Sequence, residues 1–76
     1  MNFYVYEESE RTPVFILSVV CASNDNRNDM YVCNSYDELY DAFEQYDPKS
    51  LCATIDLSQV SNFNRRLIYD RLQQMI

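Results

Sequence analysis

The sequence predicts a two-layer α+β domain in which a four-stranded, mostly antiparallel sheet carries two helices, in the order βββαβα. Three runs rich in aromatic and β-branched residues come first, which is typical of strands. A capped segment with apolar residues at three- and four-residue steps follows, and a short strand-like run precedes a second such segment. With 76 residues the chain can build only one core, so residues 1–76 are expected to form a single domain.

The first half of the chain is expected to form an antiparallel meander. FYVYEE (3–8) and MYVC (30–33) have the composition of strands. PVFILSVVCA (13–22) is almost continuously apolar, which is typical of a central strand that is buried on both faces or lies at a packed seam. The strands are joined by short polar loops, and such sequential strands usually pair with their neighbours.

The second loop, 23–29, imitates the start of a calcium-binding EF-hand loop. Counted from Asn24, however, the glycine position holds Asp29 and the final glutamate position holds Ser35. The chain contains no glycine, so Asn and Asp are needed here to turn the backbone. We therefore predict a turn, and expect neither a metal site nor another cofactor.

Residues 35–47, SYDELYDAFEQYD, are expected to form the first helix. Ser35 followed by Glu38 is a capping box. Apolar residues recur on one face, at Tyr36, Leu39, Tyr40, Phe43 and Tyr46. The opposite face carries carboxylates within about 60° of one another, at Asp37, Asp41 and Glu44. The segment contains no Lys or Arg that would neutralise them.

The remaining elements are expected to be a strand and a second helix. Pro48 closes the first helix, and LCATIDL (51–57) alternates as in an edge strand with one buried face. Residues 58–76 form an amphipathic helix with apolar residues at Val60, Phe63, Leu67, Ile68, Leu72, Met75 and Ile76.

Two polar residues, Asn64 and Arg71, lie within the apolar arc of the second helix. We expect Arg71 to lay its methylene groups on the core and to hold its guanidinium in water. The alternative is an ion pair with a carboxylate at the edge of the core, such as Asp56.

The net charge of −6 is unevenly distributed along the chain, which holds twelve acids and six bases. Residues 1–56 contain eleven of the acids and three of the bases. Such a negative surface repels nucleic acid and anionic membranes and attracts basic protein surfaces. The expected partner is therefore a basic protein surface, not nucleic acid itself or a membrane.

The chemistry of enzymes is poorly represented in this chain. It contains no histidine, and the absence of glycine removes the phosphate-binding loops that need a close backbone approach. Cysteines without histidine lack the usual activating base. Carboxylates on a convex helix have no pocket that would shift their pKa values apart. We therefore expect a protein that is not an enzyme.

The three cysteines, Cys21, Cys33 and Cys52, each lie in an apolar run and form no CxxC motif, as is typical of free buried thiols. Neither a secretory signal nor an apolar run long enough to cross a bilayer is evident. These features favour the cytoplasm, where thiols stay reduced.

In length, charge and layout the chain resembles the small phage-encoded inhibitors grouped as anti-CRISPR and DNA-mimic proteins. The resemblance rests on overall composition and on the acidic helix 35–47 that follows three strands. It implies a non-enzymatic inhibitor that occupies a basic nucleic-acid-binding surface in the host cytoplasm. On a helix, carboxylates three and four residues apart stand about 5–6 Å apart, comparable with phosphates along a strand. The residues expected to contact the partner are Asp37, Glu38, Asp41, Glu44 and Asp47, together with Glu7, Glu8 and Glu10 of the first loop.

Two other functions fit the same sequence. In the first, the chain is a small assembly module that forms a homodimer or docks on a larger complex through tyrosines on the uncovered sheet face, such as Tyr4, Tyr6 or Tyr31. In the second, it is an antitoxin or immunity-type protein that neutralises a basic nuclease. The second differs from a phage inhibitor only in its biological setting.

Overall fold

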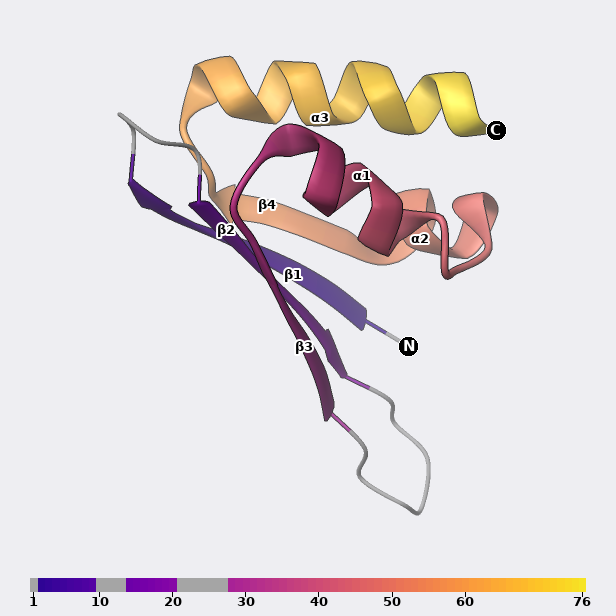
Figure 1. Cartoon of the computed structure of the whole chain (residues 1–76). Helices are drawn as coiled ribbons and strands as arrows, with labels where there is room; N and C mark the ends of the chain where they lie inside the picture. The colour runs from indigo at the N-terminus through magenta and orange to yellow at the C-terminus, as the bar shows by residue number, and fades with distance from the viewer. Residues whose placement is uncertain (1, 10–13, 21–27) are drawn as a thin grey trace.

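The computed structural model describes residues 2–9, 14–20 and 28–76, and it contains one mixed sheet with three helices on the same face (Figure 1). The sheet order is β3-β2-β1-β4. The elements are β1 (Asn2–Ser9), β2 (Val14–Val20), β3 (Asn28–Cys33), α1 (Tyr36–Phe43), α2 (Pro48–Thr54), β4 (Ile55–Gln59) and α3 (Asn62–Met75). The predicted α+β class with a four-stranded sheet is confirmed. Residues 23–27 of the predicted turn lie outside the described residues, and residues 28 and 29 belong to β3, so the prediction of a turn is wrong for those two.

The meander predicted for the first half of the chain is present. β1 pairs with β2 and β2 with β3, both antiparallel. β4 lies at the edge of the sheet, as expected, but it runs parallel to β1, which makes the sheet mixed. A parallel return requires a crossover connection, and α1 and α2 lie in the segment that brings the chain back to β1.

A third helix, α2, replaces the first half of the strand predicted at 51–57. Asp47 caps it, because the Asp47 carboxylate accepts hydrogen bonds from the Ser50 backbone N–H at 3.3 Å and the Ser50 hydroxyl at 3.1 Å. Pro48 occupies the first turn, where its missing N–H costs nothing. The prediction of a strand is therefore wrong for residues 51–54 and right for the residues that follow.

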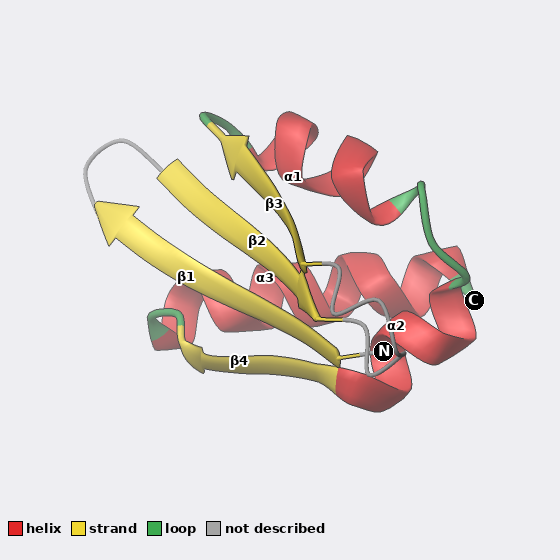
Figure 2. Cartoon of the chain, turned by 90° about the horizontal axis from the view of Figure 1, so that it is seen from below, coloured by secondary structure: helices red, strands yellow, loops and turns green. Residues whose placement is uncertain are grey.

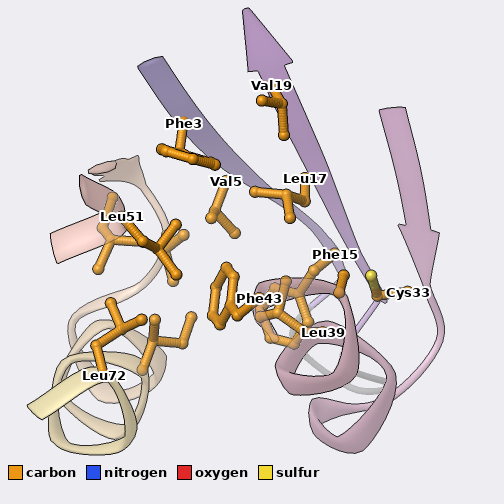
Figure 3. Close-up of a cluster of buried hydrophobic side chains, with 14 residues drawn as sticks. Phe3, Val5, Phe15, Leu17, Val19, Cys33, Leu39, Phe43, Leu51 and Leu72 are labelled. Carbon is orange, nitrogen blue, oxygen red and sulfur yellow. The ribbon is translucent and has the colours of Figure 1, made fainter. Parts of the chain in front are cut away.

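The core lies between the sheet and the three helices. Phe15, Leu17 and Val19 of β2 are fully buried. In Figure 3, Phe15 lies beside Leu39 and Phe43 of α1, and Val19 lies at the far end of the strand from them. The alternate residues of β2 are only half-buried, because none of the described helices covers the other face of the sheet. The central position predicted for this strand is right, but burial on both of its faces is not.

The helix α3 packs against the core with a phase different from that predicted. Asn64, Ile68 and Leu72 form its buried stripe, whereas Phe63 is 72% exposed. Asn64 tolerates burial because its side-chain amide is hydrogen-bonded on both sides, as described below. No described helix is long and apolar enough to cross a membrane.

Candidate partner-binding surface

The helix α1 begins at the predicted cap Ser35, but Glu38 bonds the backbone of the preceding residue instead of that of Ser35. The Glu38 backbone N–H donates to the Ser35 hydroxyl at 3.2 Å, and the Glu38 carboxylate accepts a hydrogen bond from the Asn34 backbone N–H. Leu39, Ala42 and Phe43 are buried beneath the helix. The cap and these contacts fix the direction in which the outer face of α1 points.

Three carboxylates form the outer face of α1, and we call them the acidic stripe: Asp37, Asp41 and Glu44. All three are exposed. None of their side-chain carboxylates makes a hydrogen bond or ion pair with another residue in the described part of the chain. Because residues 35–47 contain no Lys or Arg, the charge of the stripe stays uncompensated on the helix itself.

Two further predicted contact residues, Glu38 and Asp47, are exposed but already hold helix termini. Glu38 completes the cap of α1, and Asp47 caps α2. Negative charge at a helix N-terminus is stabilised by the helix dipole. A partner could therefore contact Glu38 and Asp47 only if their carboxylates kept their hydrogen bonds at the helix N-termini at the same time.

The three glutamates predicted to contact the partner from the first loop, Glu7, Glu8 and Glu10, lie in different environments. Glu7 lies on the helix-facing side of β1, and its carboxylate accepts from the Ser61 backbone N–H at 2.9 Å and the Ser61 hydroxyl at 3.4 Å. It also accepts a hydrogen bond from the Asn64 side-chain amide. Glu8 is exposed, and Glu10 lies outside the described residues. Glu7 therefore holds the N-terminus of α3 to the sheet and is not a free surface carboxylate.

The contact of Glu7 is part of a polar network that runs from α1 to β1. Tyr36 donates its hydroxyl hydrogen to the Oδ1 atom of Asn64, and Asn64 donates from Nδ2 to Glu7. Asn64 is only 5% exposed. The sequence signal was the position of Asn64 in the apolar arc of α3, but its partners could not be identified without the fold.

Arg71 also departs from both expectations. Its guanidinium carbon lies 5.2 Å from the centre of the Tyr40 ring, which is a cation–π contact between α3 and α1. Burial raises the pKa of Tyr40. Asp56 does not pair with Arg71. It accepts from the Ser58 backbone N–H at 2.8 Å, and this residue, followed by Arg65, holds the pKa of Asp56 below its usual value.

A groove runs between β3 and α1, beside the acidic stripe. It has a volume of about 430 Å³ and is lined by Met30, Tyr31, Val32, Cys33, Asn34, Glu38, Asp41 and Ala42. None of these residues is basic, and Glu38 and Asp41 are the charged ones. Burial, followed by the nearby charge of Glu38, raises the pKa of the Cys33 thiol.

The uncovered face of the sheet carries exposed apolar side chains. Met30 and Val32 are each 65% exposed, and Tyr6 is 40% exposed. Tyr31 does not belong to this face, contrary to the prediction. It lies on the helix side, packs against the core and bonds the Tyr46 hydroxyl at 2.9 Å.

Comparisons with known proteins return no related family: neither a family model, nor a curated protein, nor a solved structure matches this chain. Within the described residues, no three Cys, Asp or Glu side chains are grouped so that they could hold a metal ion. The candidate site therefore consists of the acidic stripe and its surroundings.

Proposed function

We propose that this protein is a non-enzymatic acidic inhibitor that binds the basic, nucleic-acid-binding surface of a target protein, as anti-CRISPR and other phage anti-defence proteins do. The observation that carries this proposal is the acidic stripe. The carboxylates of Asp37, Asp41 and Glu44 are exposed and have no partner among the described residues, so the charge of the stripe is available to a binding partner.

The stripe is attached to a part of the molecule that holds it in one orientation. The buried side of α1 is anchored in the core by Leu39 and Phe43, and its flank is held by the Tyr36 network and by the contact of Arg71 with Tyr40. Charges held in fixed positions lose less conformational freedom on binding than charges on a mobile loop. This supports recognition of a defined basic surface instead of general electrostatic attraction.

The proposal is tested by capture from a host lysate with two variants of equal charge. In the first, the stripe is neutralised by Asp37→Asn, Asp41→Asn and Glu44→Gln. In the second, three exposed acids that are not among the predicted contact residues are neutralised by Asp29→Asn, Asp56→Asn and Asp70→Asn. Three exposed charge contacts are worth about 0.6–3 kcal/mol in total, so the stripe variant should bind the captured protein about three- to 150-fold more weakly than wild type.

The outcome depends on the position of the charges and on salt. The control variant should retain most of the binding, and capture by wild type should weaken between about 0.1 and 1 M sodium chloride, because exposed charges are screened. If both variants bind their target equally well, or if capture is unchanged in high salt, the acidic stripe is not the binding surface.

A second function, assembly through the uncovered sheet face, is favoured by the exposure of Met30 and Val32. Such a module would form a homodimer that does not depend on the stripe. Sedimentation of wild type and of a Met30→Gln, Val32→Thr variant distinguishes the two. A wild-type dimer that becomes monomeric in the variant would support assembly, and a monomeric wild type at micromolar concentration would contradict homodimerisation.

The same surface would serve an antitoxin or immunity-type protein whose basic target is a nuclease. The identity of the captured protein decides between the two settings. In either case we expect the protein to act in the cytoplasm, where the free thiols of Cys33 and Cys52 would stay reduced.

A further inference from the structure

The strand β3 forms one edge of the sheet. Its inner side pairs with β2 from Asn28↔Val20 to Cys33↔Phe15, and no described strand pairs with its outer side. An edge strand presents a row of backbone N–H and C=O groups that can pair with another chain. β3 is therefore a template for an added strand.

The helix α1 lies alongside this edge. In Figure 2, in which the sheet is viewed from its uncovered face, α1 is beyond β3, on the side away from β2. The groove of about 430 Å³ between the two elements is the space next to the β3 backbone. A strand added at the usual spacing of about 4.8 Å would enter this groove and run beneath α1.

The two walls of the groove differ in chemistry. On the side of α1, Glu38 and Asp41 are exposed and negative. On the side of the uncovered sheet face, Met30 and Val32 are apolar and 65% exposed. Successive side chains of a strand point to opposite faces, so an added strand would meet both walls in alternation.

We propose that the β3 edge binds an extended segment of the target as a fifth strand, in which basic side chains alternate with apolar ones. This inference rests on the proposed function and specifies how the basic partner is recognised. The basic side chains point toward Glu38 and Asp41, and the apolar side chains extend the row formed by Met30 and Val32. Backbone pairing supplies affinity, and the alternation supplies specificity. Because β3 has six residues, the bound segment has about five to seven.

The charge of the groove argues against a second copy of this chain as the occupant. Pairing of two β3 edges would bring Glu38 and Asp41 of one copy toward the same residues of the other. Like charges held close together oppose association, and each chain carries a net charge of −6. An extended basic segment is instead attracted both by Glu38 and Asp41 and by the net negative charge of the chain.

The experiment uses three synthetic seven-residue peptides with blocked ends. The first alternates lysine or arginine with valine or isoleucine. The second has the same composition, with its basic and apolar residues in two separate blocks. The third has the alternating sequence, but every second backbone nitrogen is methylated so that it cannot donate a hydrogen bond. Binding to the full chain is measured by calorimetry and by two-dimensional NMR of the backbone amides.

The alternating peptide should bind at least about tenfold more tightly than either control peptide, because only it combines backbone pairing with the correct alternation. The amide signals of β3 should shift, and those of its N–H groups that point away from β2 should exchange more slowly with solvent. If the three peptides bind alike, or if the shifts map to the acidic stripe and leave β3 unchanged, the inference is overturned.

A pair of variants with equal charge separates this inference from the proposed function. The groove pair is Glu38→Gln with Asp41→Asn, in which glutamine still serves the helix cap. The outer pair is Asp37→Asn with Glu44→Gln. The groove pair should weaken the alternating peptide about two- to 30-fold, and the outer pair should leave it within about twofold. If the outer pair weakens the natural target while the peptides bind alike, the strand model fails and the proposed function stands. If neither pair affects the target, both fail.

Discussion

The replacement Tyr36→Phe tests whether the buried network holds α1 and α3 together. The substitution removes the hydroxyl that donates to Asn64, while the ring can keep its contacts with Phe15, at a centroid distance of 5.5 Å, and with Tyr40, at 6.3 Å. The Oδ1 atom of Asn64 then lacks a donor in a side chain that is 5% exposed. An unsatisfied buried acceptor costs about 1–3 kcal/mol.

That cost is large for a domain of this size, because a single small core rarely supplies more than about 3–5 kcal/mol. We therefore expect Tyr36→Phe to lower the free energy of unfolding by about 1–3 kcal/mol, as measured by urea unfolding followed by far-UV circular dichroism. The melting temperature should fall by about 4–8 °C for each kcal/mol lost.

The matched control is Tyr40→Phe, on the same helix. The Tyr40 hydroxyl makes no hydrogen bond in the described part of the chain, and the ring that lies beneath Arg71 is kept. This control should change stability by no more than about 0.5 kcal/mol. In an Asn64→Ala background, Tyr36→Phe should also cost no more than about 0.5 kcal/mol, since its partner is already absent. Equal losses for Tyr36→Phe and Tyr40→Phe would refute the network.

Three further outcomes are expected from single substitutions. Glu7→Ala should lower the free energy of unfolding by about 2–4 kcal/mol, because Glu7 bonds Ser61 and Asn64. The neighbouring substitution Glu8→Ala should change the free energy of unfolding by less than about 0.5 kcal/mol. Equal effects of the two substitutions in urea unfolding would contradict the structural role of Glu7. Glu44→Lys should stabilise the chain by about 0.5–1 kcal/mol, because it places a positive charge at the C-terminal end of α1, and an unchanged or lower melting temperature would contradict this. The folded pKa of the Cys33 thiol lies above its unfolded value of about 8.5. The stabilisation that Cys33 contributes is therefore present below pH 8.5 and is lost as the pH rises through the folded pKa. Urea unfolding between pH 7 and 10 should show this loss of stability, and the loss should be smaller in a Cys33→Ala variant.

Much of the fold could be predicted from local patterns. The strands of the meander and the cap at Ser35 depend on residues close together in the chain, and both are present. The helix α2 was missed because Leu51, Ala53, Ile55 and Leu57 were interpreted as one alternating strand. The better signal was Asp47 followed by Pro48, a helix cap and a favoured first residue.

The candidate site was less accessible to sequence reasoning. The acidic stripe follows from helical geometry alone, so Asp37, Asp41 and Glu44 could be grouped correctly. Glu7 could not be separated from Glu8, since its bonds reach Ser61 and Asn64, more than 50 residues away in the chain. The direction of β4 and the groove beside β3 likewise depend on how distant elements meet.

The acidic stripe lowers the stability of the helix that carries it. Asp37 and Asp41 form a like-charge pair at i,i+4, and Glu44 lies at the negative end of the helix dipole. A helix this short is not stable alone, so α1 depends on the burial of Leu39 and Phe43 and on its contacts with α3. A single Lys at position 44 would relieve part of the repulsion among these carboxylates. Stabilising surface-charge substitutions of this kind are common, so selection for stability alone would readily find one. Solubility does not require the present arrangement either, since it is served equally well by charges of mixed sign. The unbalanced stripe therefore argues for selection on binding. If so, the Glu44→Lys protein should be more stable than wild type and should capture its target more weakly.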